Sequence, residues 1–188
     1  MALKIYDARL EHCRLLAPHF QLAWSDIAGE EISIEVDYQS QLEPIAASAD
    51  PAEEVLKLLR DGWSADMERI FTSVGTHRDE VRFLLAGQSL RQFGSQGEQR
   101  VTVLALLLAA RNLAHEEGAP TPLVLLDDVM SELDPGRRRR LMETLSGEGQ
   151  AIITAADRDL FSGEELAGAA VIEVAGGSVS RARAGFHV

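Results

Sequence analysis

The feature that most constrains the fold of this chain is a short apolar run that ends in two acids. Residues 123–126 read Leu-Val-Leu-Leu, and Asp127 and Asp128 follow directly. A continuously apolar run of this length is typical of a central strand in a sheet that is covered on both faces. Because α/β proteins bind ligands beyond the carboxyl ends of such strands, the pattern predicts an acidic site at a sheet edge. Taken alone, the pattern also fits a strand that ends in an acidic turn.

The second half of the chain alternates predicted strands and helices around this run. Helices are expected over 97–117, where the apolar middle should be buried on all sides, and from Asp134 to about Gly147. A shorter helix is expected over 159–166. The predicted strands are 123–126, 151–154, 171–174 and 178–181. This order is typical of a mostly parallel α/β sheet.

The first 40 residues predict one helix and one strand. Apolar residues at steps of three and four indicate a helix over 3–24, which Pro18 should break or kink. Alternating apolar and polar residues over 31–38 indicate a strand with one buried face.

A second helix and a hairpin are expected between these elements and the acidic run. Asp50 can cap a helix whose first turn holds Pro51, and this helix ends at Gly62 or runs on past Met67. Residues 81–93 are expected to form two strands joined by a tight turn.

The charge of the chain limits what it can bind alone. Its formal net charge is −12, whereas proteins that bind nucleic acids without a partner are usually basic. A DNA-contacting surface should therefore be local or lie elsewhere. The one dense basic run, 137–140, is expected to be a solvated helix face.

Compartment and membrane signals point to the cytoplasm. The apolar run 101–110 is about half as long as the roughly 20 residues that a membrane span needs. Residues 1–10 carry no secretory signal pattern. The single cysteine, Cys13, cannot form an intrachain disulfide, which fits a reducing compartment.

The two acids and the start of the predicted helix that follows Ser95 suggest a site that binds and hydrolyses a nucleotide. In nucleotide hydrolases, an acid placed like Asp127 holds Mg²⁺, usually through water, and a neighbour such as Asp128 can orient or deprotonate the attacking water. Upstream, Ser95 and Gly97 stand at the start of a predicted helix, where free N–H groups bind anions. A plain helix cap also explains Ser95.

Three ordered motifs resemble the RecF family of ABC-type ATPases. Residues 95–100, Ser-Gln-Gly-Glu-Gln-Arg, resemble the ABC signature in its RecF form. Residues 123–134 resemble a Walker B motif followed by a D-loop. Residues 75–80, Gly-Thr-His-Arg-Asp-Glu, resemble an element usually written Gly-Pro-His-Arg-Asp-Asp. The likeness is clearest over 75–157 and weaker over the rest.

The resemblance implies an α/β fold, the C-terminal lobe of an ABC-type P-loop ATPase head with a small helical arm. Residues 1–70 would form the arm, with one strand, and residues 71–188 the lobe. A P-loop needs a lysine after a glycine, and the only lysines, Lys4 and Lys57, follow other residues. The N-terminal Walker A lobe is therefore expected to be absent, as in a gene fragment, a split gene or a gene model that starts late at Met1. Uncovered apolar surface should then make the isolated chain self-associate.

The family pattern implies a role for each matching residue. Asp127 would hold Mg²⁺ through water, and Asp128 would be the catalytic base. The residues implied to bind ATP across a dimer interface are Ser95, Gln96, Gly97, Glu98, Ser131 and Asp134.

Three further positions of the motifs receive no chemical role. For the lone histidine His77 a structural role is expected, and Arg78 is left without a role. Ala156 takes the place of a switch histidine, which leaves the γ-phosphate sensor unassigned.

The resemblance implies a cytoplasmic protein that acts in DNA repair, replication, recombination and the SOS response and does not bind a membrane. It would bind ATP and Mg²⁺, form an ATP-dependent homodimer on single-strand/double-strand DNA junctions, and load RecA at gaps with RecR and RecO. Hydrolysis of ATP would need the missing Walker A half. Two alternatives stay open: a lobe of another SMC-like repair ATPase, against which the short arm without heptads argues, and a non-catalytic interaction fragment.

Overall fold

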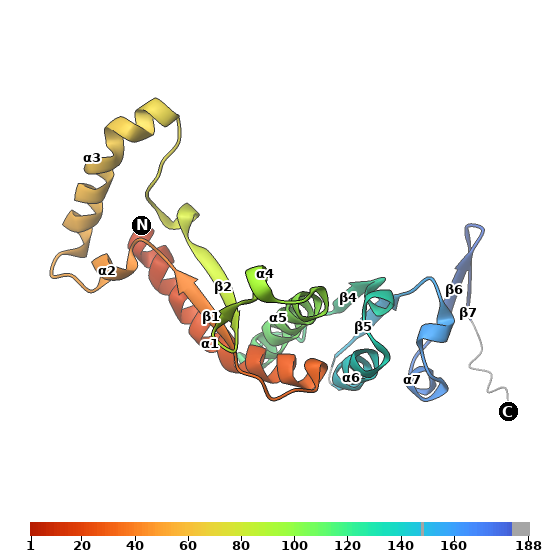
Figure 1. Ribbon diagram of the computed structural model, residues 1–188. Helices are drawn as coiled ribbons and strands as arrows, with labels where there is room; N and C mark the ends of the chain where they lie inside the picture. The colour runs from red at the N-terminus through yellow and green to blue at the C-terminus, as the bar shows by residue number, and fades with distance from the viewer. Residues whose placement is uncertain (148, 182–188) are drawn as a thin grey trace.

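The computed structural model describes residues 1–147 and 149–181, which form an elongated molecule (Figure 1). A helical arm stands at one end, a body of helices and short strands follows, and a two-stranded hairpin lies at the other end. The helices are α1 (Ala2–Ala28), α2 (Glu43–Ala46), α3 (Pro51–Arg69), α4 (Leu90–Phe93), α5 (Gln96–Glu116), α6 (Pro135–Leu145) and α7 (Gly163–Ala167). Three 3₁₀ turns are η1 (Thr76–Arg78), η2 (Val129–Glu132) and η3 (Arg158–Leu160). The strands are β1 (Ile34–Gln39), β2 (Glu80–Leu85), β3 (Gln88–Ser89), β4 (Val124–Asp127), β5 (Ala151–Thr154), β6 (Ile172–Ala175) and β7 (Ser178–Arg181).

The strands form three small sheets within the described residues. β1, β2 and β3 make an antiparallel sheet, and β6 and β7 make an antiparallel hairpin. Among residues 1–147 and 149–181, only β4 and β5 pair in parallel, with Asp127 opposite Thr154. The expectation of a mostly parallel sheet is therefore wrong for this part of the molecule, because most of the strands come as local hairpins or pair with a neighbour that runs the other way.

Helix α1 runs from the arm into the body without interruption. Pro18 lies inside it and does not end it, contrary to the expected break. Proline removes one backbone hydrogen bond of a helix. Leu16 and Phe20, on either side of Pro18, are both buried in the same core, so their packing holds the helix together across this position.

The core lies where α1 packs on α5 and on the sheet of β1 and β2. Phe20 and Trp24 of α1 are buried beside Val101 and Leu108 of α5. The ring of Phe20 lies 5.2 Å from that of Phe83 on β2. Burying large side chains of this kind contributes about 1.5–3 kcal/mol each, so this junction is the main source of stability.

Two apolar segments are covered on one side only. On α5, Val103 is 66% exposed, and on the β4–β5 sheet Leu125 and Ile152 are 62% and 49% exposed. The predictions of a helix buried on all sides and of a strand covered on both faces are therefore wrong in the described part of the chain. A continuous apolar run shows which residues can be buried, but not what covers them. No helix within residues 1–147 and 149–181 combines the length and the apolar character that crossing a bilayer requires.

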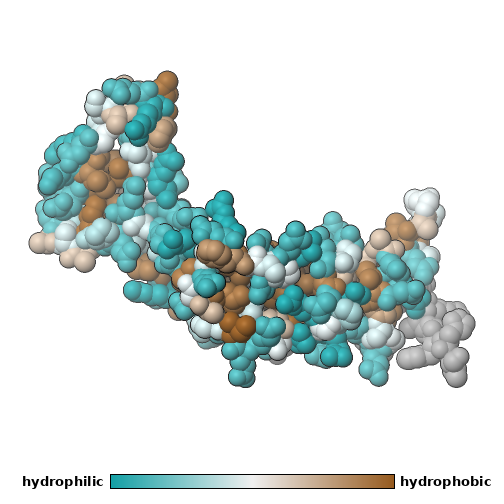
Figure 2. All heavy atoms as spheres, viewed as in Figure 1, coloured by the Kyte–Doolittle hydropathy of each residue, from teal (hydrophilic) through white to brown (hydrophobic). Residues whose placement is uncertain are grey.

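The arm is an exposed helix. Asp50 caps α3, because its side chain accepts a hydrogen bond from the N–H of Glu53 at 3.2 Å, and the helix continues past Gly62. None of its residues is buried, and Trp63 is 66% exposed. Figure 2 shows the resulting apolar surface on the arm.

The predicted hairpin is only partly present. β2 turns at Ala86 and Gly87, which both have positive φ. β3 then pairs over two residues, and the chain continues as α4, which ends at Gly94. The prediction of a strand at the end of residues 81–93 is therefore wrong. Leu90 is buried at the start of α4, and the helical turn carries it toward the core.

The basic run 137–140 is mostly not a solvated face. Arg140 donates to the carbonyls of Ile27 and Ala28 at 3.0 and 2.7 Å, which caps the end of α1. Arg138 donates to the carbonyl of Leu133 at 2.9 Å. Only Arg139 of the run is exposed. Carbonyls that helix and turn ends leave without partners explain why these cations turn inward.

Candidate functional site

The two acids of the apolar run lie at the carboxyl end of β4, as predicted. β5 runs parallel to β4 and ends at Thr154, opposite Asp127. The hydroxyl of Thr154 donates a hydrogen bond to Oδ1 of Asp127. Both side chains are exposed, so the carboxylate faces solvent at the sheet edge.

Asp128 begins a tight turn directly after the strand. Its φ of 51° lies in the left-handed region, which aspartate tolerates better than most residues. Its N–H group lies 3.2 Å from the carbonyl oxygen and 3.1 Å from the hydroxyl of Thr154. Its own carbonyl accepts a hydrogen bond from the Ser131 hydroxyl at 2.8 Å, which closes η2.

Ser95 caps α5, and its hydroxyl is already engaged. It accepts from the N–H of Glu98 at 3.2 Å and donates to the Glu98 carboxylate at 2.8 Å. That carboxylate also accepts from the Ser95 N–H at 2.7 Å, which completes a capping box. The bond from the Ser95 side chain holds the pKa of Glu98 below its usual value. An anion at this helix start would compete with Glu98 for the hydroxyl.

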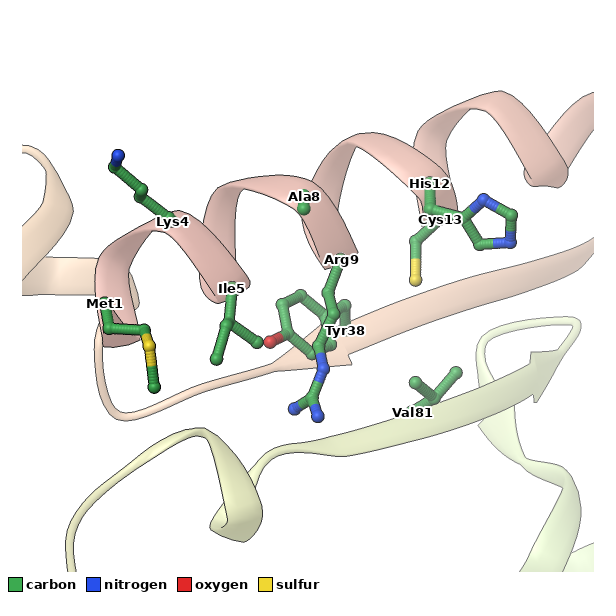
Figure 3. Close-up of a pocket in the computed structure, with 9 residues that line it drawn as sticks. All are labelled: Met1, Lys4, Ile5, Ala8, Arg9, His12, Cys13, Tyr38 and Val81. Atoms are coloured by element: carbon green, nitrogen blue, oxygen red, sulfur yellow. The ribbon is translucent and has the colours of Figure 1, made fainter.

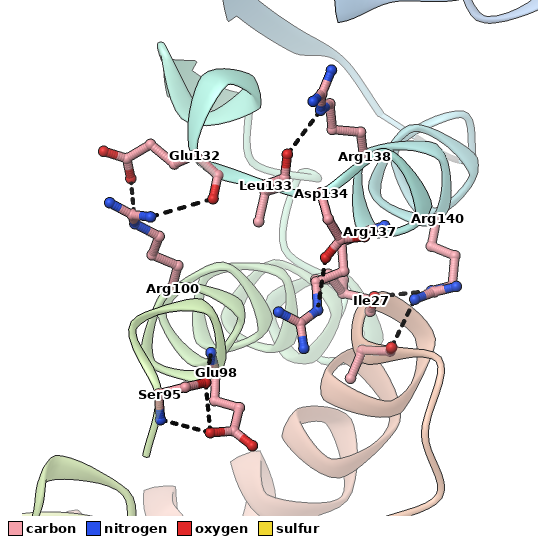
Figure 4. Close-up of polar contacts among 11 residues, drawn as sticks. Ile27, Ser95, Glu98, Arg100, Glu132, Leu133, Asp134, Arg137, Arg138 and Arg140 are labelled. Carbon is pink, nitrogen blue, oxygen red and sulfur yellow. Dashed lines mark hydrogen bonds and ion pairs between the residues drawn. The ribbon is translucent and has the colours of Figure 1, made fainter. Parts of the chain in front are cut away.

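Arg100 ties α5 to the turn after β4, and Arg137 of α6 lies beside the start of α5 (Figure 4). Arg100 pairs with the Glu132 carboxylate at 2.8 Å and donates to the Glu132 carbonyl at 3.3 Å. Arg137 lies 3.5 Å from the Asp134 carboxylate. Its Nη1 atom is 2.6 Å from the place that a Cβ on Gly97 would take, so the glycine leaves room for the guanidinium.

Asp134 serves as the cap of α6. Its carboxylate accepts a hydrogen bond from the N–H of Arg137 at 3.0 Å. This bond, helped by the charge of Arg137, holds the pKa of Asp134 below its usual value. Asp134 is thus ionised at neutral pH and fixes the direction in which α6 leaves the turn.

The side chains of His77 and Arg78 both contact the backbone of the preceding loop. The His77 ring nitrogen lies 2.9 Å from the Thr72 carbonyl, and Arg78 donates to the same carbonyl at 3.0 Å. Arg78 also lies over the Phe71 ring at 4.6 Å. Gly75, with φ of 136°, permits the turn that brings these residues back over residue 72.

Asp79 of the same element joins α1 to β1. Its side chain is 2% exposed, and it accepts from the Tyr38 hydroxyl at 2.5 Å and from Arg9 at 3.1 Å. Burial and the bond to Asp79 raise the pKa of Tyr38 to about 12. The element over 75–80 is therefore a joint between the arm and the body.

The described hollows of the molecule lie in the arm, away from the acids. One of about 530 Å³ lies between α1 and the strands β1 and β2, and Figure 3 shows the residues that line it. Another, of about 580 Å³, lies between α2 and α3. Neither includes a residue of the signature or Walker B motifs, and the side chains of Asp127 and Asp128 are exposed.

The acid pair fits Mg²⁺ held mainly by a nucleotide. Magnesium bound by proteins usually keeps several waters and takes one or two carboxylates beside substrate phosphates. Asp127 offers one exposed carboxylate whose Oδ1 is fixed by Thr154. The described residues contain no group of three or more histidine, cysteine or acidic side chains that would hold a metal without a nucleotide.

The predicted site residues lie in two separate places, at the start of α5 and at the end of β4, and three residues that were not predicted lie beside them. No hydrogen bond or ion pair among the described residues joins Ser95 to Asp127. Thr154, Arg100 and Arg137 were not predicted as site residues. Only Thr154 had a visible signal, because it ends the strand that pairs in parallel with β4, and parallel neighbours end at the same sheet edge.

The comparisons point to one group of proteins. No protein-family model matches the chain. The chain is 33% identical over 182 residues to the DNA replication and repair protein RecF of Heliobacterium modesticaldum, covering 96% of the chain and 49% of the relative. It is 34% identical over 183 residues to the RecF of Bacillus pumilus, with 95% and 49% covered. The chain thus spans about half the length of the curated relatives it matches.

Solved structures agree on the fold. The recombination mediator protein RecF–ATP in the RecFOR pathway is 24% identical, with a TM-score of 0.73 over 97% of this chain and 47% of that one. A structure from work on ATP-driven dimerisation and DNA-stimulated activation of SMC ATPases is 16% identical, with a TM-score of 0.50 over 94% of this chain and 87% of that one. The α/β fold is that of the C-terminal region of these ATPases.

Proposed function

The chain is homologous to the C-terminal half of the RecF DNA replication and repair proteins, and from this we propose that it provides the signature, Walker B and D-loop residues of a RecF-like repair ATPase. The observation that carries the proposal is the pair of exposed acids at the end of β4, next to a turn that is tied to the start of α5. Residues 1–70 form the arm region in this proposal, with the end of α1 packed into the core of the lobe, and residues 71–188 form the lobe.

Each acid takes one task in hydrolysis. Asp127 holds Mg²⁺ through water, and Asp128 orients or deprotonates the attacking water. When bound, Mg²⁺ offsets the negative charge that develops on the phosphates. The positive φ of Asp128 and its bonds to Thr154 support this role, because they hold the second acid beside the first.

ATP is bound by two protomers in this proposal. The signature residues Ser95, Gln96, Gly97 and Glu98 contact the phosphates of ATP held by the opposite protomer at the start of α5, where the phosphate takes the place of the Glu98 carboxylate in the capping box. Ser131 and Asp134 lie at the dimer interface. The Arg100–Glu132 ion pair supports coupling of the two sites, since it joins the signature helix to the turn between the acids and Asp134.

The wider role follows that of the relatives. The full-length protein acts in the cytoplasm as an ATP-dependent homodimer on single-strand/double-strand DNA junctions, in recombination, replication and the SOS response. With RecR and RecO it loads RecA at gaps. The net charge of −12 supports placing the DNA-contacting surface outside this chain or in a local patch.

The test is ATP hydrolysis by this chain, alone and mixed with a P-loop lobe from a RecF relative. We expect hydrolysis only in the mixture. Asp127→Asn and Ser95→Arg should each abolish it, while both variants keep the far-ultraviolet circular dichroism of the native chain. Hydrolysis that survives either substitution would overturn the proposed roles.

A second function is favoured by the exposed apolar face of β4 and β5. Leu125 and Ile152 would be covered if the chain binds another polypeptide without catalysing any reaction. Stable association with the P-loop lobe, without hydrolysis in any mixture, would support this non-catalytic function.

A further inference from the structure

The hydroxyl of Thr154 is shared between the two acids. It donates a hydrogen bond to Oδ1 of Asp127 and accepts one from the N–H of Asp128 at 3.1 Å. A threonine hydroxyl has one donor and two acceptor lone pairs, so one group serves both neighbours with ordinary chemistry. The Thr154 carbonyl lies 3.2 Å from the same N–H and reinforces the second contact.

We propose that Thr154 is the positioning residue of the acid pair, which orients the metal-binding carboxylate and holds the turn of the second acid. This rests on the roles of Asp127 and Asp128 in the proposed function. The last torsion of an aspartate is broad, so an exposed carboxylate has no preferred direction of its own. Because Thr154 fixes one oxygen of Asp127, the other oxygen would be available to hold Mg²⁺ through water.

The same hydroxyl stabilises the backbone of Asp128. A non-glycine residue with positive φ costs free energy, and it persists where its surroundings hold it. Thr154 offers the Asp128 N–H two acceptors, both from the end of β5. The side chain of Asp128 therefore leaves the sheet edge in one direction relative to Asp127.

The strand itself does not need this hydroxyl. Thr154 is exposed, so no buried polar group depends on it, and valine or isoleucine would suit a strand equally well. Ile152 and Ile153 precede it in β5 and carry only hydrocarbon. The contacts of the hydroxyl all go to the acid pair, which separates this position from the rest of the strand.

The test compares Thr154→Val, which keeps the shape but removes the hydroxyl, with Thr154→Ser, which keeps the hydroxyl. Thr144→Val is the matched control, because the Thr144 hydroxyl donates only to the carbonyl of Arg140 within α6. In the 188-residue chain, we expect the Asp128 amide hydrogen to exchange about fivefold faster in Thr154→Val, from the loss of one hydrogen bond. Thr154→Ser and Thr144→Val should exchange at the native rate at this amide.

Manganese is the second probe, added in every case together with ATP and the P-loop lobe, because the acids fit a metal that is held mainly by a nucleotide, and it is read from paramagnetic broadening of the amide signals near the acids. Removing a group that orients a metal ligand typically weakens affinity about 10- to 100-fold, so Thr154→Val should bind Mn²⁺ at least about tenfold more weakly than native chain and Thr154→Ser. Native exchange at Asp128 in Thr154→Val would overturn the proposal. If native chain shows no Mn²⁺ broadening at Asp127 while exchange responds as expected, the metal role in the proposed function fails and the positioning role stands.

Discussion

Arg140 joins α6 to the end of α1, and its removal gives a sharp test of the structure. The residue lies on α6, the helix that follows the turn after the acids, and it donates to the last two carbonyls of α1 at 3.0 and 2.7 Å. It also lies against Gly29, where a Cβ would come within 2.4 Å of the guanidinium carbon. Arg140→Met keeps most of the hydrocarbon of this side chain and removes the charge and the hydrogen bonds.

The expected loss follows from these contacts. A hydrogen bond from a charged group contributes about 1.5–3 kcal/mol, and a cation at a helix C-terminus adds about 0.3–1 kcal/mol. The two bonds come from one side chain and are not fully additive, so Arg140→Met should lower the free energy of unfolding by about 2–4 kcal/mol. Arg139→Met is the matched control. Arg139 is exposed, and its ion pair with Glu143, at 3.9 Å on the helix surface, contributes little to stability.

Urea unfolding, followed by circular dichroism at low protein concentration, measures both losses. Arg139→Met should stay within about 0.5 kcal/mol of the native chain. Gly29→Ala adds a double-mutant cycle, since the new methyl group would displace the guanidinium. Gly29→Ala should lower the free energy of unfolding more in the native chain than in the Arg140→Met variant. Equal losses in Arg139→Met and Arg140→Met, or strict additivity with Gly29→Ala, would refute the capping role.

Three further predictions concern other parts of the molecule. The pKa of Tyr38 is about 12 in the folded chain, above its ordinary value, so the stability it provides is full below pH 10 and is lost as pH rises toward 12. Solvent screening makes the loss smaller than the full shift at about 1.4 kcal/mol per pH unit, so alkaline urea titrations should show a loss of about 1–2 kcal/mol in native chain that is absent from Tyr38→Phe. Ser95→Ala removes the cap that Glu98 completes, and thermal melting should report a loss of about 1 kcal/mol, whereas Ser95→Thr should be nearly neutral. The isolated chain should self-associate in sedimentation through surfaces such as Leu125, and a monodisperse, cooperatively melting monomer would contradict this.

Helix starts and the acidic strand end could be predicted from local sequence because their physics is local. Asp50, Ser95 and Asp134 all cap helices where the pattern placed them, through bonds to N–H groups three residues along. The strand before Asp127 also forms as predicted. These features depend on neighbours within a few residues, which the sequence displays directly.

The features that could not be predicted depend on contacts between distant segments. Val103 and Leu125 are as apolar as their buried neighbours, and only the position of other elements decides that they are exposed. Arg140 turns inward because the end of α1, more than 100 residues earlier in the chain, needs hydrogen-bond donors. Thr154 meets Asp127 only because β4 and β5 pair in one register. Charge and hydropathy do not carry that information.

The central claim is that the acids of one protomer work with the signature of the other, and mixing two inactive variants tests it most directly. Chain with Asp127→Asn and chain with Ser95→Arg would each be paired with P-loop lobe and then combined. In a mixed dimer, one site has an intact acid and an intact signature, and the other site has neither. If the sites act independently, hydrolysis should return to about a quarter of the native rate on mixing, since about half of the dimers are mixed. Mixtures that stay as inactive as each variant alone, although mixed dimers form, would contradict the claim.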